Sequence, residues 1–126
     1  MFELKIVTHF AAAHQLTMVA KKCENLHGHN WKVEVCVGGD KLNKAGVLID
    51  FGILKSHVRE ITQLIDHRFL NELDLFDNGI PSSENIAVFI AEALEKKLSD
   101  SGVRVTRVTT WESEDACATY SPPVRT

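Results

Sequence analysis

The chain has 126 residues, 44% of them hydrophobic, so it can bury one sizeable core and we expect a single domain over residues 1–126. Its formal net charge of −3 gives no electrostatic basis for binding a nucleic acid. No apolar run approaches the roughly 18 residues of a membrane span, and the N-terminal segment alternates in polarity, unlike a signal peptide. We therefore expect a cytoplasmic protein that binds neither nucleic acid nor membrane.

The first forty residues predict two strands, each with one apolar face. In residues 2–14 most apolar side chains occupy even positions, which is the period-2 pattern of a half-buried strand. In residues 29–37 they occupy odd positions, and the Gly-Gly-Asp sequence at 38–40 supplies a turn. Both strands are expected to bury one face and expose the other.

The middle of the chain changes to a helical period. After Asp50, a candidate N-cap, apolar residues recur every three or four positions, which predicts a helix that ends near His67. A second helix is expected to begin after Ser82 and to stop by Gly102.

Two short strands are predicted after the helices, at residues 103–112 and 116–121. The order is therefore β-β-α-α-β-β. We expect an α+β fold, in which one antiparallel sheet carries both helices on one face. The edge strands of such a sheet are unpaired unless subunits join edge to edge, so we also expect a homo-oligomer.

The stretch CENLHGHNW, residues 23–31, places a thiol, a carboxylate and two imidazoles directly before the second strand. His27 and His29 are two residues apart, so both leave the same face of an extended chain, while His14 continues the apolar face of the first strand. Neighbouring strands would bring the three imidazoles to one point. Three protein ligands leave the fourth position of a tetrahedral zinc ion open, which is typical of a catalytic site. The alternative is three core histidines with satisfied hydrogen bonds.

Six stretches can be picked out along the chain: FAAAHQL, CENLHGHNW, GVLIDFGILK, IDHRFLN, PSSENIAVFI and WESEDACATY. In this order they resemble the signature segments of the 6-pyruvoyltetrahydropterin synthase and 6-carboxytetrahydropterin synthase family. The resemblance extends from about Phe2 to Tyr120 and leaves out only the final SPPVRT. It implies the tunnelling fold, whose β-β-α-α-β-β subunits close into a barrel as a trimer or hexamer. It also implies a zinc enzyme that acts on 7,8-dihydroneopterin triphosphate at sites between subunits.

The resemblance gives His14, His27 and His29 the role of zinc ligands and Cys23 the role of the catalytic thiol. Zinc would polarise the hydroxyls of the substrate side chain, so that a nearby thiolate can remove a proton and start the elimination of triphosphate. The alternative for Cys23 is a fourth zinc ligand, which would close the site and make it structural.

Three more residues match functional positions of the family. Asp66 and His67 resemble a proton relay that serves the thiol of a neighbouring subunit, and a direct contact between them requires the helix to end there. Without the resemblance, His67 would be a cation at a helix C-terminus. Glu112 matches the pterin anchor, because a carboxylate can accept two parallel N–H bonds from the ring edge. The alternative for Glu112 is a solvated surface charge.

The gap Cys23-x-x-x-His27 resembles the 6-carboxytetrahydropterin synthases of queuosine biosynthesis, whereas 6-pyruvoyltetrahydropterin synthases usually have a longer gap. We therefore predict conversion to 6-carboxy-5,6,7,8-tetrahydropterin with loss of acetaldehyde and triphosphate. Glu24 makes the stretch CENLHGH, which resembles a C-E-x-x-H-G-H variant linked to additional cleavage towards 6-hydroxymethyl-7,8-dihydropterin, a folate precursor. The alternative for Glu24 is a solvated loop residue.

Two other classes of function use part of the same residues. A non-catalytic zinc- or pterin-binding module would keep the histidines and Glu112 but would not need Cys23, Asp66 and His67 together. A metal-dependent hydrolase would combine the histidines with an acidic general base, but it gives Glu112 no ring edge to bind. The joint presence of the thiol and the Asp-His pair favours a pterin enzyme.

Overall fold

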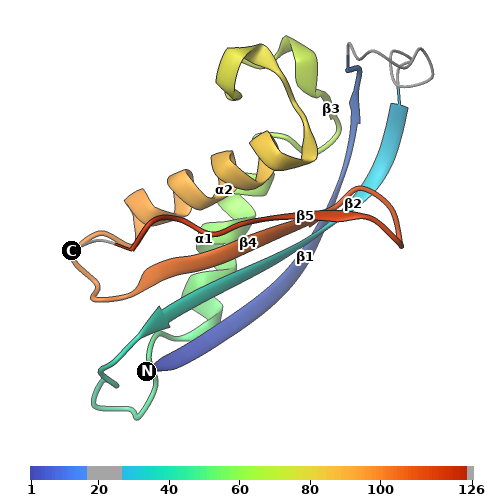
Figure 1. Ribbon diagram of the computed structural model, residues 1–126. Coiled ribbons are helices and arrows are strands. Elements are labelled where there is room, and N and C mark those ends of the chain that lie inside the picture. The colour runs from blue at the N-terminus through green and yellow to red at the C-terminus, as the bar shows by residue number, and fades with distance from the viewer. Residues whose placement is uncertain (17–26, 125–126) are drawn as a thin grey trace.

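The computed structural model describes residues 1–16 and 27–124, which form a curved sheet with two helices packed on one face (Figure 1). The predicted α+β class is confirmed. The elements in chain order are β1 (Phe2–His14), β2 (His27–Gly39), α1 (Phe51–Thr62), β3 (Arg68–Phe69), the 3-10 helices η2 (Leu70–Glu72) and η3 (Asp77–Gly79), α2 (Ser83–Lys97), β4 (Arg104–Trp111) and β5 (Cys117–Tyr120).

Strands β1 and β2 are the longest elements of the sheet and pair along their whole length. Their antiparallel register places His14 opposite His27 and Ala12 opposite His29. The apolar face of each strand points toward the helices, as the alternation of the sequence predicts. The core residues that β2 contributes are all inaccessible to solvent: Trp31, Val33, Val35 and Val37.

Both helices begin at the predicted N-caps. A side-chain oxygen of Asp50 accepts a hydrogen bond from the Ile53 amide at 3.2 Å, and the Ser82 hydroxyl accepts one from the Asn85 amide at 3.1 Å. These bonds satisfy backbone donors that have no partner within the first helical turn. The helices then bury apolar side chains against the sheet: Leu54, Val58 and Ile61 from α1, and Ile86, Ile90 and Leu94 from α2.

Helix α1 is shorter than predicted, because it ends at Thr62 and not near His67. Asp66 and His67 instead bond the backbone of Ala11 in β1. The chain then runs parallel to β1 as the short strand β3, which the sequence pattern did not predict. A contact with a distant strand thus replaces the last helical turns.

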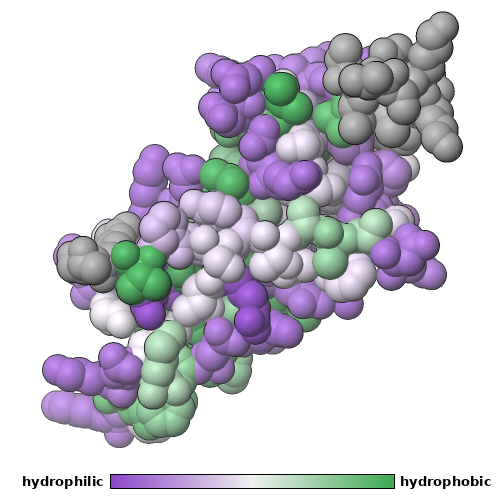
Figure 2. Space-filling model, in the orientation of Figure 1, coloured by the Kyte–Doolittle hydropathy of each residue, from purple (hydrophilic) through white to green (hydrophobic). Residues whose placement is uncertain are grey.

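The sheet has the strand order β3-β1-β2-β4-β5, and every pairing except that of β1 with β3 is antiparallel. Its edges are the two shortest strands, β3 and β5. On the face of the molecule shown in Figure 2, apolar side chains gather only in small separate groups among hydrophilic ones. Neither helix in the described part of the chain is long and apolar enough to cross a bilayer.

Candidate metal and substrate site

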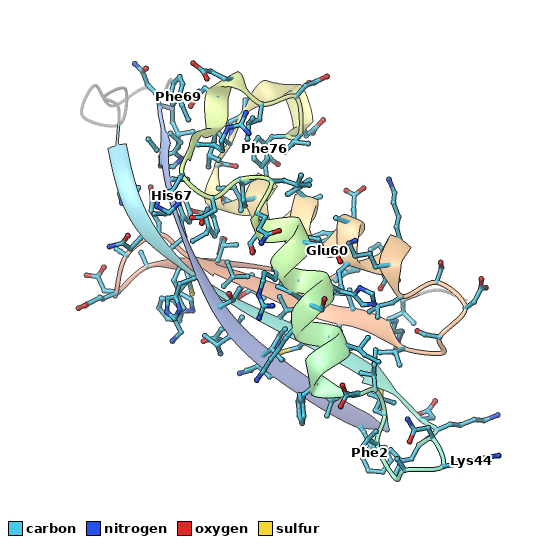
Figure 3. All side chains as sticks on the ribbon, turned by 180° about the vertical axis from the view of Figure 1, so that it is seen from behind. Phe2, Lys44, Glu60, His67, Phe69 and Phe76 are labelled. Carbon is cyan, nitrogen blue, oxygen red and sulfur yellow. The ribbon has the colours of Figure 1, made fainter. Side chains whose placement is uncertain are left out.

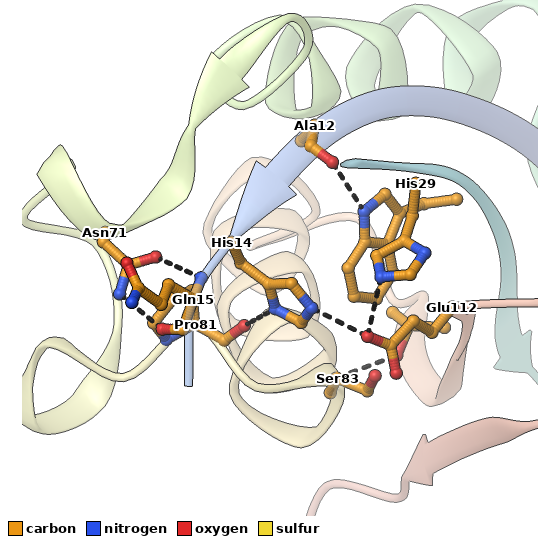
Figure 4. A network of polar contacts seen from close by, with 10 residues as sticks. Ala12, His14, Gln15, His29, Asn71, Pro81, Ser83 and Glu112 are labelled. Atoms are coloured by element: carbon orange, nitrogen blue, oxygen red, sulfur yellow. Dashed lines mark hydrogen bonds and ion pairs between the residues drawn. The ribbon is translucent and has the colours of Figure 1, made fainter. Parts of the chain in front are cut away.

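Three potential metal ligands converge where β1 ends, β2 begins and β4 gives way to the following loop. His14, His29 and Glu112 each offer one ligand atom, and these atoms all lie within 4.8 Å of one another (Figure 4). His14 is buried, with 2% of its side chain exposed, whereas 23% of His29 and 34% of Glu112 are exposed. The cluster is therefore anchored in the core on one side and open to solvent on the other.

The Glu112 carboxylate joins the two imidazoles. Its Oε1 lies 2.7 Å from Nε2 of His14 and 3.1 Å from Nε2 of His29. On its other side, the His14 ring places Nδ1 2.8 Å from the carbonyl oxygen of Pro81. A carbonyl oxygen can only accept a hydrogen bond, so Nδ1 carries a proton and Nε2 is the atom that faces the site.

The indole of Trp31 supports both imidazoles from inside the core. Its ring packs edge-to-face against His14 and His29, with centroids 5.2 and 5.7 Å apart. The indole nitrogen donates to the carbonyl oxygen of Ala12 at 3.4 Å, which ties the ring to β1. Because Trp31 is fully buried, both imidazoles rest on a rigid surface.

The donor set fits a divalent cation such as zinc. Imidazole nitrogen and carboxylate oxygen are common zinc ligands, and a ligating histidine usually donates its other ring N–H to a backbone carbonyl or a carboxylate. Pro81 supplies such a carbonyl to His14. The distances from Glu112 to the two rings are hydrogen-bond distances, so the carboxylate contacts both nitrogens directly.

The structure thus brings together two of the three histidines that the sequence singled out. The backbone of His27 lies opposite His14 in the sheet register. Glu112 joins the cluster, a contact that the sequence did not reveal. Cys23 and Glu24 lie outside the described residues, so their predicted roles stay predictions.

Asp66 and His67 are in direct contact, as the end of the helix before them permits. One oxygen of Asp66 accepts a hydrogen bond from the Ala11 amide at 2.9 Å, and the other lies 3.0 Å from Nδ1 of His67. His67 has a positive φ of 58°, which turns the chain out of the helix, and 81% of its side chain is exposed. The Ala11 N–H, followed by His67, lowers the pKa of Asp66.

An open pocket of about 460 Å³ is lined by His67 of this pair and by His29 of the metal cluster. His29 belongs to β2, and His67 lies in the turn directly before β3. The remaining walls of the pocket come from β1, β2 and β3: Ala11, Ala12, Ala13, Gly28, Asn30, Arg68 and Phe69. A larger pocket, of about 740 Å³, lies between α2, the start of β4 and residues 120–124, and contains none of the predicted site residues.

Sequence reasoning did not assign a role to Pro81 or Thr110. Pro81 acts through its backbone carbonyl, which no side-chain pattern reveals. Thr110 lies two residues before Glu112, and its buried hydroxyl donates to the carbonyl of Ser83 at 2.8 Å. The stretch PSSEN signals the start of a helix, but not that its first turn lies against the site.

Comparison with known proteins agrees with this fold. The sequence profile described as 6-pyruvoyl tetrahydropterin synthase matches residues 3–123, so the chain belongs to the 6-pyruvoyl tetrahydropterin synthase family. The solved structure of 6-pyruvoyl tetrahydropterin synthase from Caenorhabditis elegans superposes with a TM-score of 0.84 at 27% identity, over 97% of this chain and 96% of that one. The predicted family and tunnelling fold are confirmed.

Two archaeal relatives cover most of the chain. One, from Archaeoglobus fulgidus, is provisionally named a 6-carboxy-5,6,7,8-tetrahydropterin synthase and is 42% identical over 113 residues, 90% of each chain. The other, from Pyrococcus furiosus, is named dihydroneopterin monophosphate aldolase and is 38% identical over 106 residues, 84% of this chain and 85% of the relative. The prediction of an enzyme is confirmed by these relationships.

Proposed function

We propose that this protein is a zinc-dependent 6-carboxy-5,6,7,8-tetrahydropterin synthase. It would convert 7,8-dihydroneopterin triphosphate with loss of acetaldehyde and triphosphate. The observation that carries the proposal is the convergence of His14, His29 and Glu112, where His29 also lines an open pocket. The similarity to the Archaeoglobus protein supports the choice of product.

Zinc would be held by His14, His29 and His27, and when bound it would polarise the hydroxyls of the substrate side chain. His14 is fixed by Pro81 and Trp31, and His29 rests on the same indole. The register of β1 and β2 places the backbone of His27 opposite that of His14, which supports the assignment of His27 as a ligand.

We assign Glu112 to the pterin ring. Two ligands of one tetrahedral zinc ion lie about 3.4 Å apart, given zinc–ligand bonds of about 2.0–2.1 Å. The contacts of Glu112 with the imidazoles are shorter, at 2.7 and 3.1 Å, so the carboxylate touches both rings directly, with a hydrogen bond to His14. With zinc on the histidines, this partly exposed carboxylate would be released to accept two N–H bonds from the pterin edge.

Cys23 would remove a proton from the bound substrate, and Asp66 with His67 would relay it. The side chain of His67 is 81% exposed, so its ring is accessible to a neighbouring subunit. The hydrogen bond from Ala11 keeps Asp66 ionised, so that its second oxygen can orient the His67 ring. In an oligomer the relay would serve the thiol of a neighbouring subunit.

A second candidate function is the cleavage of a dihydroneopterin phosphate to 6-hydroxymethyl-7,8-dihydropterin. The Pyrococcus relative, named an aldolase, favours it, and so does Glu24 beside the thiol. In this candidate the carboxylate of Glu24 acts as the base in place of Cys23. Both functions use the same zinc site and the same pterin anchor.

Product analysis separates these candidates. Zinc-loaded protein is incubated with 7,8-dihydroneopterin triphosphate and, separately, with the monophosphate, and pterins are identified by mass spectrometry. We expect 6-carboxy-5,6,7,8-tetrahydropterin from the triphosphate, lost in Cys23→Ala and kept in Glu24→Gln. The hydroxymethyl product, lost in Glu24→Gln, would select the second candidate. 6-Pyruvoyltetrahydropterin would place the protein in the pyruvoyl branch, and no product at all would indicate a non-catalytic module.

A further inference from the structure

The start of α2, residues 81–83, bonds to His14 of the metal cluster and to Thr110 of β4 (Figure 4). The carbonyl of Pro81 accepts the Nδ1–H of His14 at 2.8 Å, and the carbonyl of Ser83 accepts the hydroxyl of Thr110 at 2.8 Å. Pro81, His14 and Thr110 are buried. The position of residues 81–83 therefore fixes both the ring of His14 and the end of β4, directly before Glu112.

The side chain of Asn85 ties the start of α2 to residues 77–80. Its Nδ2 donates to the carbonyl of Ile80 at 2.9 Å and points to that of Asp77 at 3.4 Å. Between these two carbonyls the backbone takes positive φ values at Asn78 and Gly79, 56° and 70°. A segment with two successive left-handed residues is held in place by bonds from outside it, and Asn85 supplies them.

We infer that Asn85 is a positioning residue for the metal ligand His14. By holding the carbonyl of Ile80, the amide of Asn85 fixes the peptide that leads into Pro81. The Pro81 carbonyl then stays in line with Nδ1–H of His14, which fixes the orientation of the ring with Nε2 toward the site. This inference rests on the proposed function, because it assumes that the cluster binds zinc.

The competing explanation is that Asn85 merely stabilises the start of α2. It is the third residue of that helix, and its own amide is capped by Ser82. Asn85→Asp separates the two roles. An aspartate near a helix N-terminus interacts favourably with the helix dipole, so the helix is kept. A carboxylate cannot donate to the carbonyl of Ile80, so the support of Pro81 is lost.

The matched control is Asn43→Asp, the same change in another loop. The Oδ1 of Asn43 accepts from the amides of Ala45 and Val47, a function that aspartate can keep. The loop around Lys44 lies at the end of the sheet opposite to His67 (Figure 3). The control therefore adds the same charge without touching the site.

The test compares the affinity for zinc, measured by competition with a chromophoric chelator, in wild-type, Asn85→Asp and Asn43→Asp protein. Loss of an outer partner of a ligating histidine typically weakens metal binding 10–100-fold. We expect zinc binding about tenfold weaker in Asn85→Asp and unchanged in Asn43→Asp. Far-UV circular dichroism checks that all three are folded, and Asn85→Ala replaces Asn85→Asp if the latter does not fold.

The second measurement is the ¹⁵N-¹H spectrum of the histidine rings in the metal-free proteins, which reports the proton on each ring nitrogen without any activity. In wild-type protein the Nδ1–H of His14 should exchange slowly with solvent, and in Asn85→Asp it should exchange fast. A folded Asn85→Asp variant with wild-type zinc affinity and a protected Nδ1–H would overturn the inference, as would equal weakening in both variants. A wild-type protein that binds no zinc would instead contradict the proposed function.

Discussion

His14 is held from two opposite sides, by the Pro81 carbonyl at Nδ1 and by Glu112 at Nε2. The sequence could predict that His14 and His29 approach each other, because side chains alternate along a strand and both residues continue an apolar stripe. It could not predict that Glu112 or Pro81 would meet them. Those contacts depend on how β4 and the first turn of α2 are placed in three dimensions.

The role of Glu112 leads to a prediction about binding. Glu112→Ala should weaken the binding of 7,8-dihydroneopterin triphosphate by roughly 10–100-fold. This loss corresponds to a charge-assisted hydrogen bond, which contributes about 1.5–3 kcal/mol. Isothermal titration of the zinc-loaded protein measures this affinity, and Glu114→Ala is the control because it removes an exposed carboxylate two residues further on. Loss of zinc from Glu112→Ala would show that Glu112 is a metal ligand and not an anchor.

Asp66 leads to a prediction about pH. Its pKa is lowered by the Ala11 N–H and then by His67, so its ionised form stabilises the folded state above about pH 4, the usual pKa of aspartate. That contribution is lost as the pH falls through the lowered native pKa. Asp66→Asn should therefore be less stable at pH 7, by about 0.5 kcal/mol for this partly exposed group, and the difference should shrink below about pH 4.

Urea unfolding of both proteins between pH 3 and pH 7 measures this effect. Asp74→Asn is the control, since the exposed Asp74 makes no hydrogen bond or ion pair that links it to another described residue. A difference between wild type and Asp66→Asn that is the same at every pH would rule out the charge of Asp66 as its cause.

Among the elements, those set by local pattern were predictable and those set by distant contacts were not. The strands followed the period-2 alternation, and the helix starts followed Asp50 and Ser82. The end of α1 and the whole of β3 depend on Ala11, which lies 55 residues from Asp66. A helical apolar stripe continues past Thr62 in the sequence, but bonding to β1 redirects the chain.

The two helix caps give a prediction that separates stability from metal binding. Asp50→Ala and Ser82→Ala should each lower the free energy of unfolding by about 1 kcal/mol, because each removes the hydrogen bond to a first-turn amide. Only Ser82→Ala should also weaken zinc binding, since Ser82 adjoins Pro81. Chemical denaturation and chelator competition measure the two quantities. Equal effects of both variants on zinc binding would contradict a specific link between α2 and the site.

For the whole molecule, the short edge strands β3 and β5 leave backbone groups that a second copy of the chain could pair. We propose a trimer or hexamer in which the relay of one subunit serves the thiol of the next. Inactive Cys23→Ala and inactive His67→Ala proteins, mixed under conditions of subunit exchange, should then regain part of the activity. If exchange is verified by mass spectrometry of the mixed oligomers and no activity returns, thiol and relay belong to the same subunit.

The central claim is an open zinc site formed by histidines and able to take a substrate. Zinc K-edge X-ray absorption of the zinc-loaded protein tests it most directly, because zinc–nitrogen bonds of about 2.0–2.1 Å and zinc–sulfur bonds of about 2.3 Å are readily distinguished. We predict one zinc ion per chain with imidazole scattering, only nitrogen and oxygen ligands, and the same spectrum in Cys23→Ala. A zinc–sulfur distance that disappears in Cys23→Ala would contradict the claim, because it would make Cys23 a ligand and the site structural.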